Sequence, residues 1–244
     1  MQDNSALGRA MAMVRDLRSR CSWDRVQTRE TLRPYLIEEV HELDHAIGSA
    51  DPDAIRAEVA DLLLHLAWQL VLAEERAEFT ADQAADLLEA KMQRRHPHLF
   101  DLGAAEEWET LKRREPGTHL LDGLPPTLPE LLMAYRLQER AAAVGFDWPD
   151  AGGPAAKVRE ELGEVEAERN PGRLDHECGD LLFAVVNLAR KLGVSPGPAL
   201  QRANDRFRSR FGTVERLAAE RGVEVSTAGL EALDRLWEEA KAAG

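Results

Sequence analysis

The sequence has little of what several protein classes require. Its 244 residues include only two cysteines, Cys21 and Cys178, so neither a disulfide framework nor a self-contained zinc site is expected. No apolar run approaches the roughly 20 residues of a membrane-spanning helix. The N-terminus also lacks the apolar stretch of a signal peptide. These absences predict a protein that makes no use of a membrane and works in the reducing cytoplasm.

Aromatic residues and positive charge are scarce as well. Aromatics make up 5% of the chain, which disfavours a surface that stacks on nucleic-acid bases. Forty-four acidic residues against 31 basic ones give a net charge of -13, which disfavours binding to DNA or to anionic membranes. Because 44% of the residues are hydrophobic and 31% are charged, the composition is that of a folded globular protein.

The residues that are present predict an all-α protein. Ala, Leu, Glu and Arg dominate, and apolar residues recur three and four positions apart. Asp51-Pro52 and Asn170-Pro171 have the form of helix starts, and Thr80 with Gln83 and Thr127 with Glu130 have capping-box spacing. The predicted helices lie near residues 6–20, 29–48, 52–76, 81–95, 127–143, 154–169, 171–192, 196–221 and 227–242.

A segment rich in proline, glycine and charge separates two sets of helices. We predict a first helical domain at residues 1–100, a linker at 101–126 with a short helical stretch around 106–114, and a second helical domain at 127–244. The two sets carry the same motifs in the same order. Each has an Asp followed by Glu-Glu-x-x-Glu and then by Glu-x-x-Asp, which indicates a tandem duplication.

The acidic motifs have helical spacing. At about 100° per residue, Glu161 borders the apolar stripe of its helix, Glu164 lies about 60° beyond it, and Glu160 points further toward solvent. On the next helix, Glu177 and Asp180 share a face of a segment that is too apolar to lie on a surface. We therefore expect Glu161 and Glu164 to be half-buried and to meet Glu177 and Asp180 in an interior seam.

Carboxylates held this close repel one another and are costly to bury, so a cation must neutralise them. Salt bridges to arginine are one solution and a bound metal ion is the other. Because all the donors are oxygens, the pattern favours Mg²⁺, with Mn²⁺ as a substitute, over zinc or copper. Mg²⁺ usually shares its coordination with substrate phosphates, and cationic Arg206 and Arg210 follow downstream. The pattern is that of a nucleotide hydrolase.

The sequence resembles the MazG-type nucleoside triphosphate pyrophosphohydrolases, in their tandem-domain form, over nearly the whole chain. The first half carries the motifs Trp23-Asp24, Gln27-Thr28, Glu38-Glu39-Val40-His41-Glu42, Glu58-Val59-Ala60-Asp61 and Arg94-Arg95-His96-Pro97-His98-Leu99-Phe100. The second half carries Glu160-Glu161-Leu162-Gly163-Glu164, Glu177-Cys178-Gly179-Asp180-Leu181-Leu182-Phe183, Asn204-Asp205-Arg206-Phe207 and Arg210-Phe211. The resemblance implies two tandem MazG-like helical bundles that pair into homodimers. It also implies Mg²⁺-dependent hydrolysis of ribo- and deoxyribonucleoside triphosphates to monophosphate and pyrophosphate.

The same resemblance implies roles for particular residues. The catalytic and metal-binding acids of the second domain would be Glu161, Glu164, Glu177 and Asp180. The substrate would be held by Asn204, Arg206, Arg210 and Trp237, the last stacking on the base, although Trp237 would equally suit a structural anchor for the last helix. Arg206 stands where the family often has lysine, which keeps the charge and changes the donor geometry. A second site, in the first domain, would consist of Glu39, Glu42, Glu58, Asp61, Lys91 and Arg95.

The two domains differ around these motifs. His65 and Trp68 stand where the second domain has Ala184 and Asn187, and their bulk is expected to fill space beside the acids. Glu89 stands where the second domain has Asn204, and its negative charge would repel a triphosphate. We therefore predict that the second domain is the main catalytic one, and we interpret His65 as a core histidine whose hydrogen bonds are satisfied.

Two other function classes fit parts of the pattern. A noncatalytic helical dimerisation or adaptor protein would place its acids on exposed faces and would need no metal. A carboxylate-bridged redox protein would need Glu-x-x-His pairs to bind iron, and neither Glu58-x-x-Asp61 nor Glu177-x-x-Asp180 supplies the histidine.

Overall fold

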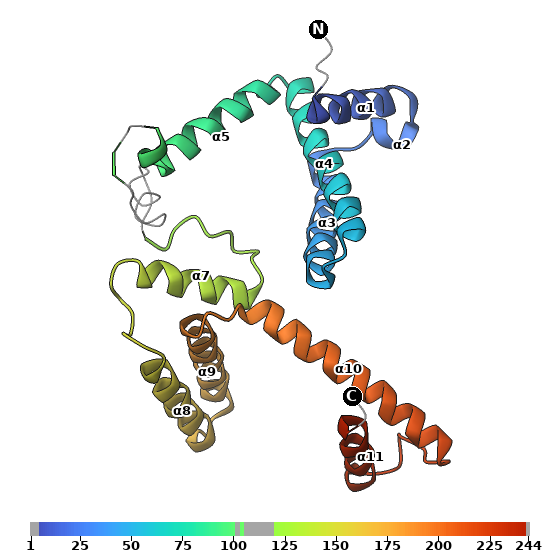
Figure 1. Ribbon diagram of the computed structural model, residues 1–244, viewed down its shortest axis with the longest axis vertical. Coiled ribbons are helices and arrows are strands. Elements are labelled where there is room, and N and C mark those ends of the chain that lie inside the picture. Colours follow the sequence, from blue (N-terminus) through green and yellow to red (C-terminus); the bar gives the residue numbers. More distant parts are fainter. Residues whose placement is uncertain (1–4, 101–102, 105–119, 243–244) are drawn as a thin grey trace. The chain divides into compact units, whose positions relative to one another are not determined.

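The computed structural model describes residues 5–100, 103–104 and 120–242. The chain divides into two compact units, Met1–Glu107 and Trp108–Gly244, which we call unit 1 and unit 2. Every regular element of the described residues is a helix, so the predicted all-α class is confirmed (Figure 1). The short helical stretch predicted around residues 106–114 lies outside the described residues.

Unit 1 is built around one long helix. Its elements are α1 (Ala6–Arg20), α2 (Ser22–Arg25), α3 (Arg29–Ser49), α4 (Pro52–Glu75), α5 (Ala81–Arg95) and the 3₁₀ turn η1 (Pro97–Leu99). Helices α1 and α3 pack against α4, whereas α5 contacts η1 (Figure 1). The core between α1, α3 and α4 consists of Met11, Val14, Leu32, Ala67, Trp68, Val71 and Leu72.

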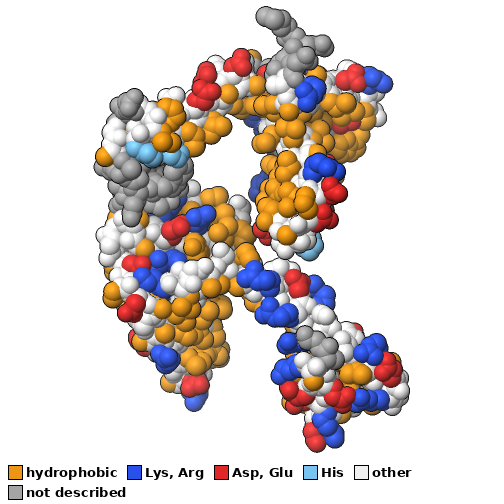
Figure 2. Space-filling view, viewed as in Figure 1, with side chains coloured by type: hydrophobic (Ala, Val, Ile, Leu, Met, Phe, Trp, Pro, Cys, Tyr) orange, Lys and Arg blue, Asp and Glu red, His pale blue; other side chains and the backbone are white. Residues whose placement is uncertain are grey.

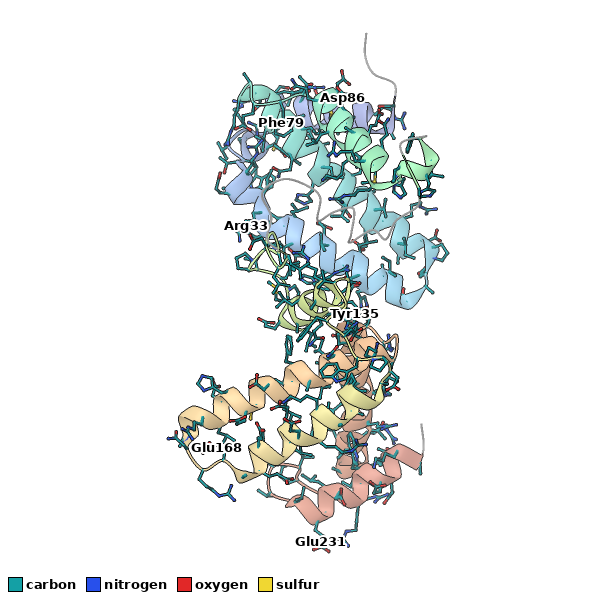
Figure 3. All side chains as sticks on the ribbon, turned by 90° about the vertical axis from the view of Figure 1, so that its left-hand side faces the viewer. Arg33, Phe79, Asp86, Tyr135, Glu168 and Glu231 are labelled. Atoms are coloured by element: carbon teal, nitrogen blue, oxygen red, sulfur yellow. The ribbon has the colours of Figure 1, made fainter. Side chains whose placement is uncertain are left out.

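Arginines hold the ends of these helices in place. The guanidinium of Arg18 lies over the Trp68 ring at 5.2 Å and donates to Glu75 at 2.7 Å and to the backbone oxygen of Asp24 at 2.9 Å. Arg29, the first residue of α3, lies 5.9 Å from the ring of Phe79, which follows α4 and is labelled in Figure 3. These contacts link α1 to the C-terminal half of α4 and the start of α3 to the segment after α4.

The described part of unit 2 combines a helical hairpin with three further helices. Its elements are α7 (Glu130–Ala142), α8 (Gly152–Ala167), α9 (Pro171–Lys191), α10 (Pro196–Glu220) and α11 (Leu230–Ala242). Helices α8 and α9 pack side by side, α7 packs on α9, and α10 contacts both α7 and α9 (Figure 1). Helix α11 packs on α10 around a small core of Val214, Ala218, Leu236 and Ala240.

Large apolar side chains remain exposed in both units. On α9, Leu182, Phe183 and Val185 expose 61%, 43% and 45% of their surface, so the expectation that this segment is buried is wrong for the single chain. The reason is that α8 and α7 cover only one side of α9. Figure 2 shows hydrophobic side chains gathered over α8 and α9. No helix within the described residues is long and apolar enough to cross a membrane.

Candidate functional site

Three carboxylates of unit 2 lie together between α8 and α9. Oxygen atoms of Glu161, Glu177 and Asp180 all lie within 4.8 Å of one another. The turn of the hairpin that carries them is capped, because the Glu168 carboxylate accepts from two backbone amides and the Asn170 side chain accepts from the Gly172 amide at 2.9 Å at the start of α9. Glu168 is labelled in Figure 3. We call these three residues the unit 2 cluster.

The fourth predicted ligand stands at the edge of this cluster. Glu161 is buried and Glu164 is exposed, so the predicted half-burial of both is wrong. The reason is that nothing in the described part of unit 2 covers the face of α8 on which Glu164 lies. Glu164 shares a hydrogen bond with Glu177. The pKa of Glu164 is raised above its ordinary value, mainly by the negative charge of Glu161 and then by this hydrogen bond.

A lysine partly neutralises the unit 2 cluster. The Lys157 ammonium lies 2.5 Å from Glu161 and 2.8 Å from Glu160, and these hydrogen bonds raise the pKa of Lys157. The second oxygen of Glu161, Oε2, is buried and has no hydrogen-bond partner. The sequence interpretation missed Lys157, although it stands four residues before Glu161, where side chains on a helix meet.

Unit 1 repeats the arrangement with a different environment. Oxygen atoms of Glu39 on α3 and of Glu58 and Asp61 on α4 lie within 4.8 Å of one another, and we call them the unit 1 cluster. Burial, and then the charges of Asp61 and Glu42, raise the pKa of Glu39. Among the described residues, the basic side chain beside Glu39 is His65, at 3.9 Å, which is charged only when protonated, and not a lysine or arginine.

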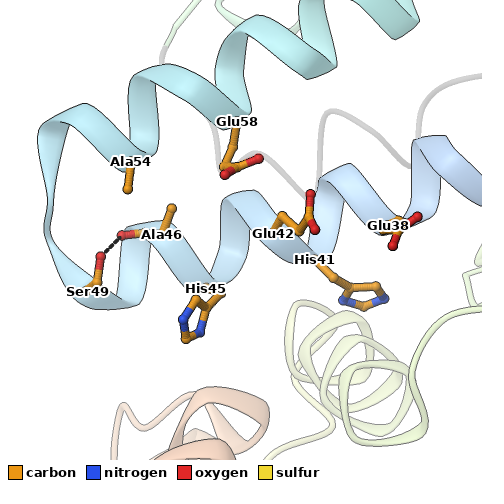
Figure 4. Close-up of a pocket in the computed structure, with 8 residues that line it drawn as sticks. All are labelled: Glu38, His41, Glu42, His45, Ala46, Ser49, Ala54 and Glu58. Atoms are coloured by element: carbon orange, nitrogen blue, oxygen red, sulfur yellow. Dashed lines mark hydrogen bonds between the residues drawn. The ribbon is translucent and has the colours of Figure 1, made fainter.

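An open pocket of about 610 Å³ adjoins the unit 1 cluster. In Figure 4, Glu42 on α3 and Glu58 on α4 point toward one another, whereas His41 and His45 point away from α4. The structure therefore places Glu42 beside the cluster, as it places Glu164 in unit 2.

The residues that distinguish the two units differ in burial and partners. Trp68 belongs to the core of unit 1, and His65 is buried as predicted, with its pKa lowered by burial. The Nδ1 atom of His65 has no partner, however, so its hydrogen bonds are not satisfied. In unit 2, Ala184 and Asn187 are buried, and Oδ1 of Asn187 accepts two hydrogen bonds from Arg190.

Asp147 ties the start of α8 to the end of α9. Arg190 donates to both oxygens of Asp147, at 2.6 and 3.1 Å, and Lys191 approaches at 3.2 Å. These hydrogen bonds lower the pKa of Asp147, and the one from Arg190 has the largest effect. The predicted motif residue Asp147 therefore positions the hairpin, a role that the sequence interpretation did not assign.

The predicted substrate residues of unit 2 are not gathered at the cluster. Asn204 lines a pocket of about 360 Å³ on α10, whereas Arg206 and Arg210 lie about 200° and 240° further round the same helix. Trp237 on α11 is 5.2 Å from Phe207 and packs against the α10–α11 core. The anchor role of Trp237 thus has a structural basis, and its contact with a base remains a prediction.

The basic residues predicted for unit 1 lie one helical turn apart. Lys91 and Arg95 are half-buried on α5, the helix that contacts η1. The structure does not bring them to the unit 1 cluster. Their role in substrate binding remains a prediction.

Both clusters suit a hard divalent cation. Three carboxylates from two helices can each give an oxygen ligand, and Oε2 of Glu161 is a buried acceptor without a hydrogen-bond partner. Unpaired carboxylates at this separation repel, so binding of a divalent ion would remove an electrostatic cost. The arrangement is that of an all-α protein in which each unit carries an acidic cluster able to hold a divalent cation.

Comparison with known proteins assigns the chain to a family. A model of the MazG nucleotide pyrophosphohydrolase domain matches residues 27–100. The nucleoside triphosphate pyrophosphohydrolase/pyrophosphatase MazG of Thermotoga maritima is 41% identical over 227 residues, which cover 91% of this chain and 89% of that protein. The nucleoside triphosphate pyrophosphohydrolase of Escherichia coli K12 is 39% identical over 247 residues, covering 95% and 94%. YabN of Bacillus subtilis is 41% identical over 94% of this chain and 50% of its own length. The chain belongs to the MazG family.

Proposed function

We propose that this chain is a nucleoside triphosphate pyrophosphohydrolase that releases monophosphate and pyrophosphate in a reaction that requires a divalent metal. The observation that carries the proposal is the approach of three carboxylates to within 4.8 Å in each unit. Relatives covering about nine-tenths of the chain bear the name of this activity, which supports the same conclusion. Because such triphosphates are held in the cytoplasm, we propose that the enzyme acts there.

Mg²⁺ is the proposed cofactor, with Mn²⁺ as a substitute, because the donors of the unit 2 cluster are all oxygens. Glu161, Glu177 and Asp180 would hold it, with Glu164 at the edge. When bound, Mg²⁺ would neutralise charge on the phosphates and lower the pKa of a water molecule. In unit 1, the corresponding ligands would come from Glu39, Glu58 and Asp61, with Glu42 beside them.

The carboxylates would also accept the proton of the attacking water. Water adds to the α-phosphorus, the bond to the bridging oxygen breaks, and pyrophosphate leaves with that oxygen. Glu164 suits the role of base better than Glu161, because its raised pKa brings proton affinity closer to the working pH. One oxygen of Glu161 is already occupied by the Lys157 ammonium, 2.5 Å away.

Arg206 and Arg210 are the proposed triphosphate contacts, Asn204 the contact to a polar edge of the substrate, and Trp237 the stacking partner of the base. Neither arginine has an ion-pair partner among the described residues, which leaves both guanidinium groups available for phosphate. In unit 1, we propose that Lys91 and Arg95 contact phosphate.

We propose that the chain forms a homodimer. Leu182, Phe183 and Val185 expose a continuous part of α9, and burying such side chains against a second copy is favourable by about 25 cal/mol per Å². Light scattering should then give the mass of two chains, and Leu182→Glu should shift the protein toward monomer. A wild-type monomer at micromolar concentration contradicts the proposal.

The predicted alternative, a noncatalytic dimerisation protein, would also explain these apolar faces. It does not explain why the second oxygen of Glu161 is buried among other acids without a hydrogen-bond partner, which costs free energy even with Lys157 on the first oxygen. The pyrophosphohydrolase is therefore the function that the site supports best.

The decisive assay incubates the full chain with each common ribo- and deoxyribonucleoside triphosphate and Mg²⁺ and separates the products. Monophosphate and pyrophosphate are expected, and none should form in excess chelator. Glu177→Ala should abolish turnover in unit 2 with an unchanged or raised metal-free Tm, because one repelling charge is gone. Glu166→Ala, an exposed α8 acid outside the cluster, is the matched control. A diphosphate product, or full activity in chelator, would contradict the proposal.

A further inference from the structure

The acids of unit 2 and the residues proposed to hold its substrate lie on two helices that diverge. Asp180 stands eleven residues before the end of α9, and Arg206 stands ten residues after the start of α10. At 1.5 Å per residue, each is about 15–17 Å from the connection between the two helices. Figure 1 shows α10 running away from the α8–α9 hairpin, with α11 at its far end. A single chain therefore holds the two parts of this proposed site apart.

Helices α10 and α11, which we call the arm, have a hydrophobic core of their own. The buried residues of this core are Val214, Ala218, Leu236 and Ala240, and the partly buried residues that pack on it also belong to the arm. Outside the arm, α10 contacts α7 and α9. Because its core needs no side chain from the hairpin, the arm can keep its structure while it packs against another molecule.

The arm and the hairpin carry complementary charges that each leaves unpaired. Arg206 and Arg210 have no ion-pair partner among the described residues, whereas two other arginines of α10 each pair with an acid. On the hairpin, Glu177 and Asp180 have no lysine or arginine partner among the described residues, and Oε2 of Glu161 is buried without a hydrogen-bond partner. A triphosphate bound with its metal at these acids needs cations on its other side, and the arm carries them.

Exposed apolar side chains occur on both parts as well. On α9, Leu182 and Val185 expose 61% and 45% of their surface, and on α10, Leu200 and Phe207 expose 50% and 58%. Contact between the arm of one copy and the hairpin of another would remove such surface from water, which is favourable. The arm would thereby extend the α9 face through which we propose that the chain dimerises.

We propose that two copies of this chain exchange their arms, so that Arg206 and Arg210 of one copy complete the unit 2 cluster of the other. The exchange is reciprocal, because a two-fold axis gives both copies the same contacts, and swapping an identical element is a low-cost route to a dimer. The inference rests on the proposed homodimer and the proposed phosphate contacts. It adds that each unit 2 site is shared between two chains.

The test combines two defective full-length chains in one dimer. Asp180→Ala disables the cluster and Arg206→Ala disables the arm, and every chain also carries Asp61→Ala to remove turnover by unit 1. Heterodimers are isolated through two different affinity tags. With exchanged arms, the intact arm of the first chain meets the intact cluster of the second, so one of two sites is complete. About half of the turnover of the Asp61→Ala dimer is therefore expected.

A heterodimer with both defects on one chain is the matched control. Asp180→Ala/Arg206→Ala paired with a chain that lacks both changes should be inactive, because each shared site then contains one defect. Sites within single chains give the reverse pattern, an inactive first heterodimer and a half-active control, and that result would overturn the inference. A monomeric wild type would overturn it as well.

Relaxation by Mn²⁺ supplies a readout that needs no turnover. An isotope-labelled Asp61→Ala/Asp180→Ala chain is paired with an unlabelled Asp61→Ala chain, whose unit 2 cluster is the intact one. Mn²⁺ should broaden the indole signal of the labelled Trp237, which packs on Phe207 of the arm, and should leave it sharp in the labelled homodimer. A sharp signal in the heterodimer would overturn the inference. Turnover of triphosphates by the wild type, measured separately, tests the proposed function.

Discussion

Lys157 competes with any cation that binds beside Glu161, because its ammonium lies 2.5 Å from one Glu161 oxygen. Replacing it with glutamine removes a positive charge from the neighbourhood of the metal. We therefore expect Lys157→Gln to bind Mn²⁺ several-fold more tightly in unit 2 and to have a lower Tm without metal, since Glu161 loses its counter-charge. Calorimetric titration of chains that also carry Asp61→Ala isolates this cluster.

Lys157→Arg keeps the charge and should bind Mn²⁺ like the parent. Weaker binding in Lys157→Gln would show that the lysine holds Glu161 in a binding-competent rotamer and does not compete with the metal.

The ion pair of Asp147 contributes to the free energy of unfolding of unit 2, and this contribution depends on pH. Because Arg190 and Lys191 lower the pKa of Asp147, its contribution is present above the unfolded pKa of about 4 and is lost as the pH falls through the lower folded value. Asp147→Asn should destabilise unit 2 by about 2 kcal/mol at pH 7, between the values for surface and buried pairs. Urea unfolding from pH 7 to pH 3 should show the difference shrinking only below about pH 4. Asp175→Asn, at an exposed position of α9, should have little effect at any pH.

At the scale of elements, local sequence signals predicted most of the fold. The side chains of Asp51 and Asn170 cap α4 and α9, and Thr80 forms its capping box with Gln83, as expected. The box predicted at Thr127 is wrong, because α7 begins at Glu130 after Pro129. The residue before a proline avoids helical backbone angles, so the helix cannot extend back to Thr127.

The same helical periodicity predicted part of the site. It placed Glu177 and Asp180 on one face of α9, and the structure sets them against Glu161. Contacts between distant segments had no such signal. Arg190 meets Asp147 across 43 residues, and a pattern of spacing within one helix cannot indicate that pair. The exposure of Glu164 was also missed, because it depends on what packs over α8.

Two glycines of α8 should respond in opposite ways to alanine. A Cβ at Gly153 would overlap the ring of Trp148, so Gly153→Ala should destabilise unit 2 by about 1–3 kcal/mol. Gly163 has nothing within 4 Å of its Cβ position, and Gly163→Ala should stabilise by about 0.5–1 kcal/mol through helix propensity. Thermal unfolding of both variants measures the contrast. A stabilised Gly153→Ala would mean that the Trp148 ring moves aside without loss of packing.

At the scale of the molecule, the chain carries two acidic clusters of similar composition in unlike surroundings. In unit 1, the cluster has His65 and no lysine partner, whereas in unit 2 it has Lys157 and the small Ala184. Composition alone could not show this, since the Glu and Asp motifs are the same in both. We therefore expect the surroundings of the two clusters, rather than their acidic residues, to decide how much of the hydrolysis each unit performs.

Unit 2 is expected to perform most of the Mg²⁺-dependent hydrolysis. Ala184 is smaller than His65 at the equivalent position, and Glu89, two residues before Lys91 on α5, adds negative charge in unit 1. Asp180→Ala should accordingly remove most turnover of ordinary triphosphates by the full chain, and Asp61→Ala should remove little. Product formation in Mg²⁺ with both variants at matched concentration measures the division. A reversed pattern, with Asp61→Ala inactive, would assign catalysis to unit 1, where the family model matches residues 27–100. Equal partial losses would mean that both clusters turn over substrate and that the bulk of His65 does not obstruct it.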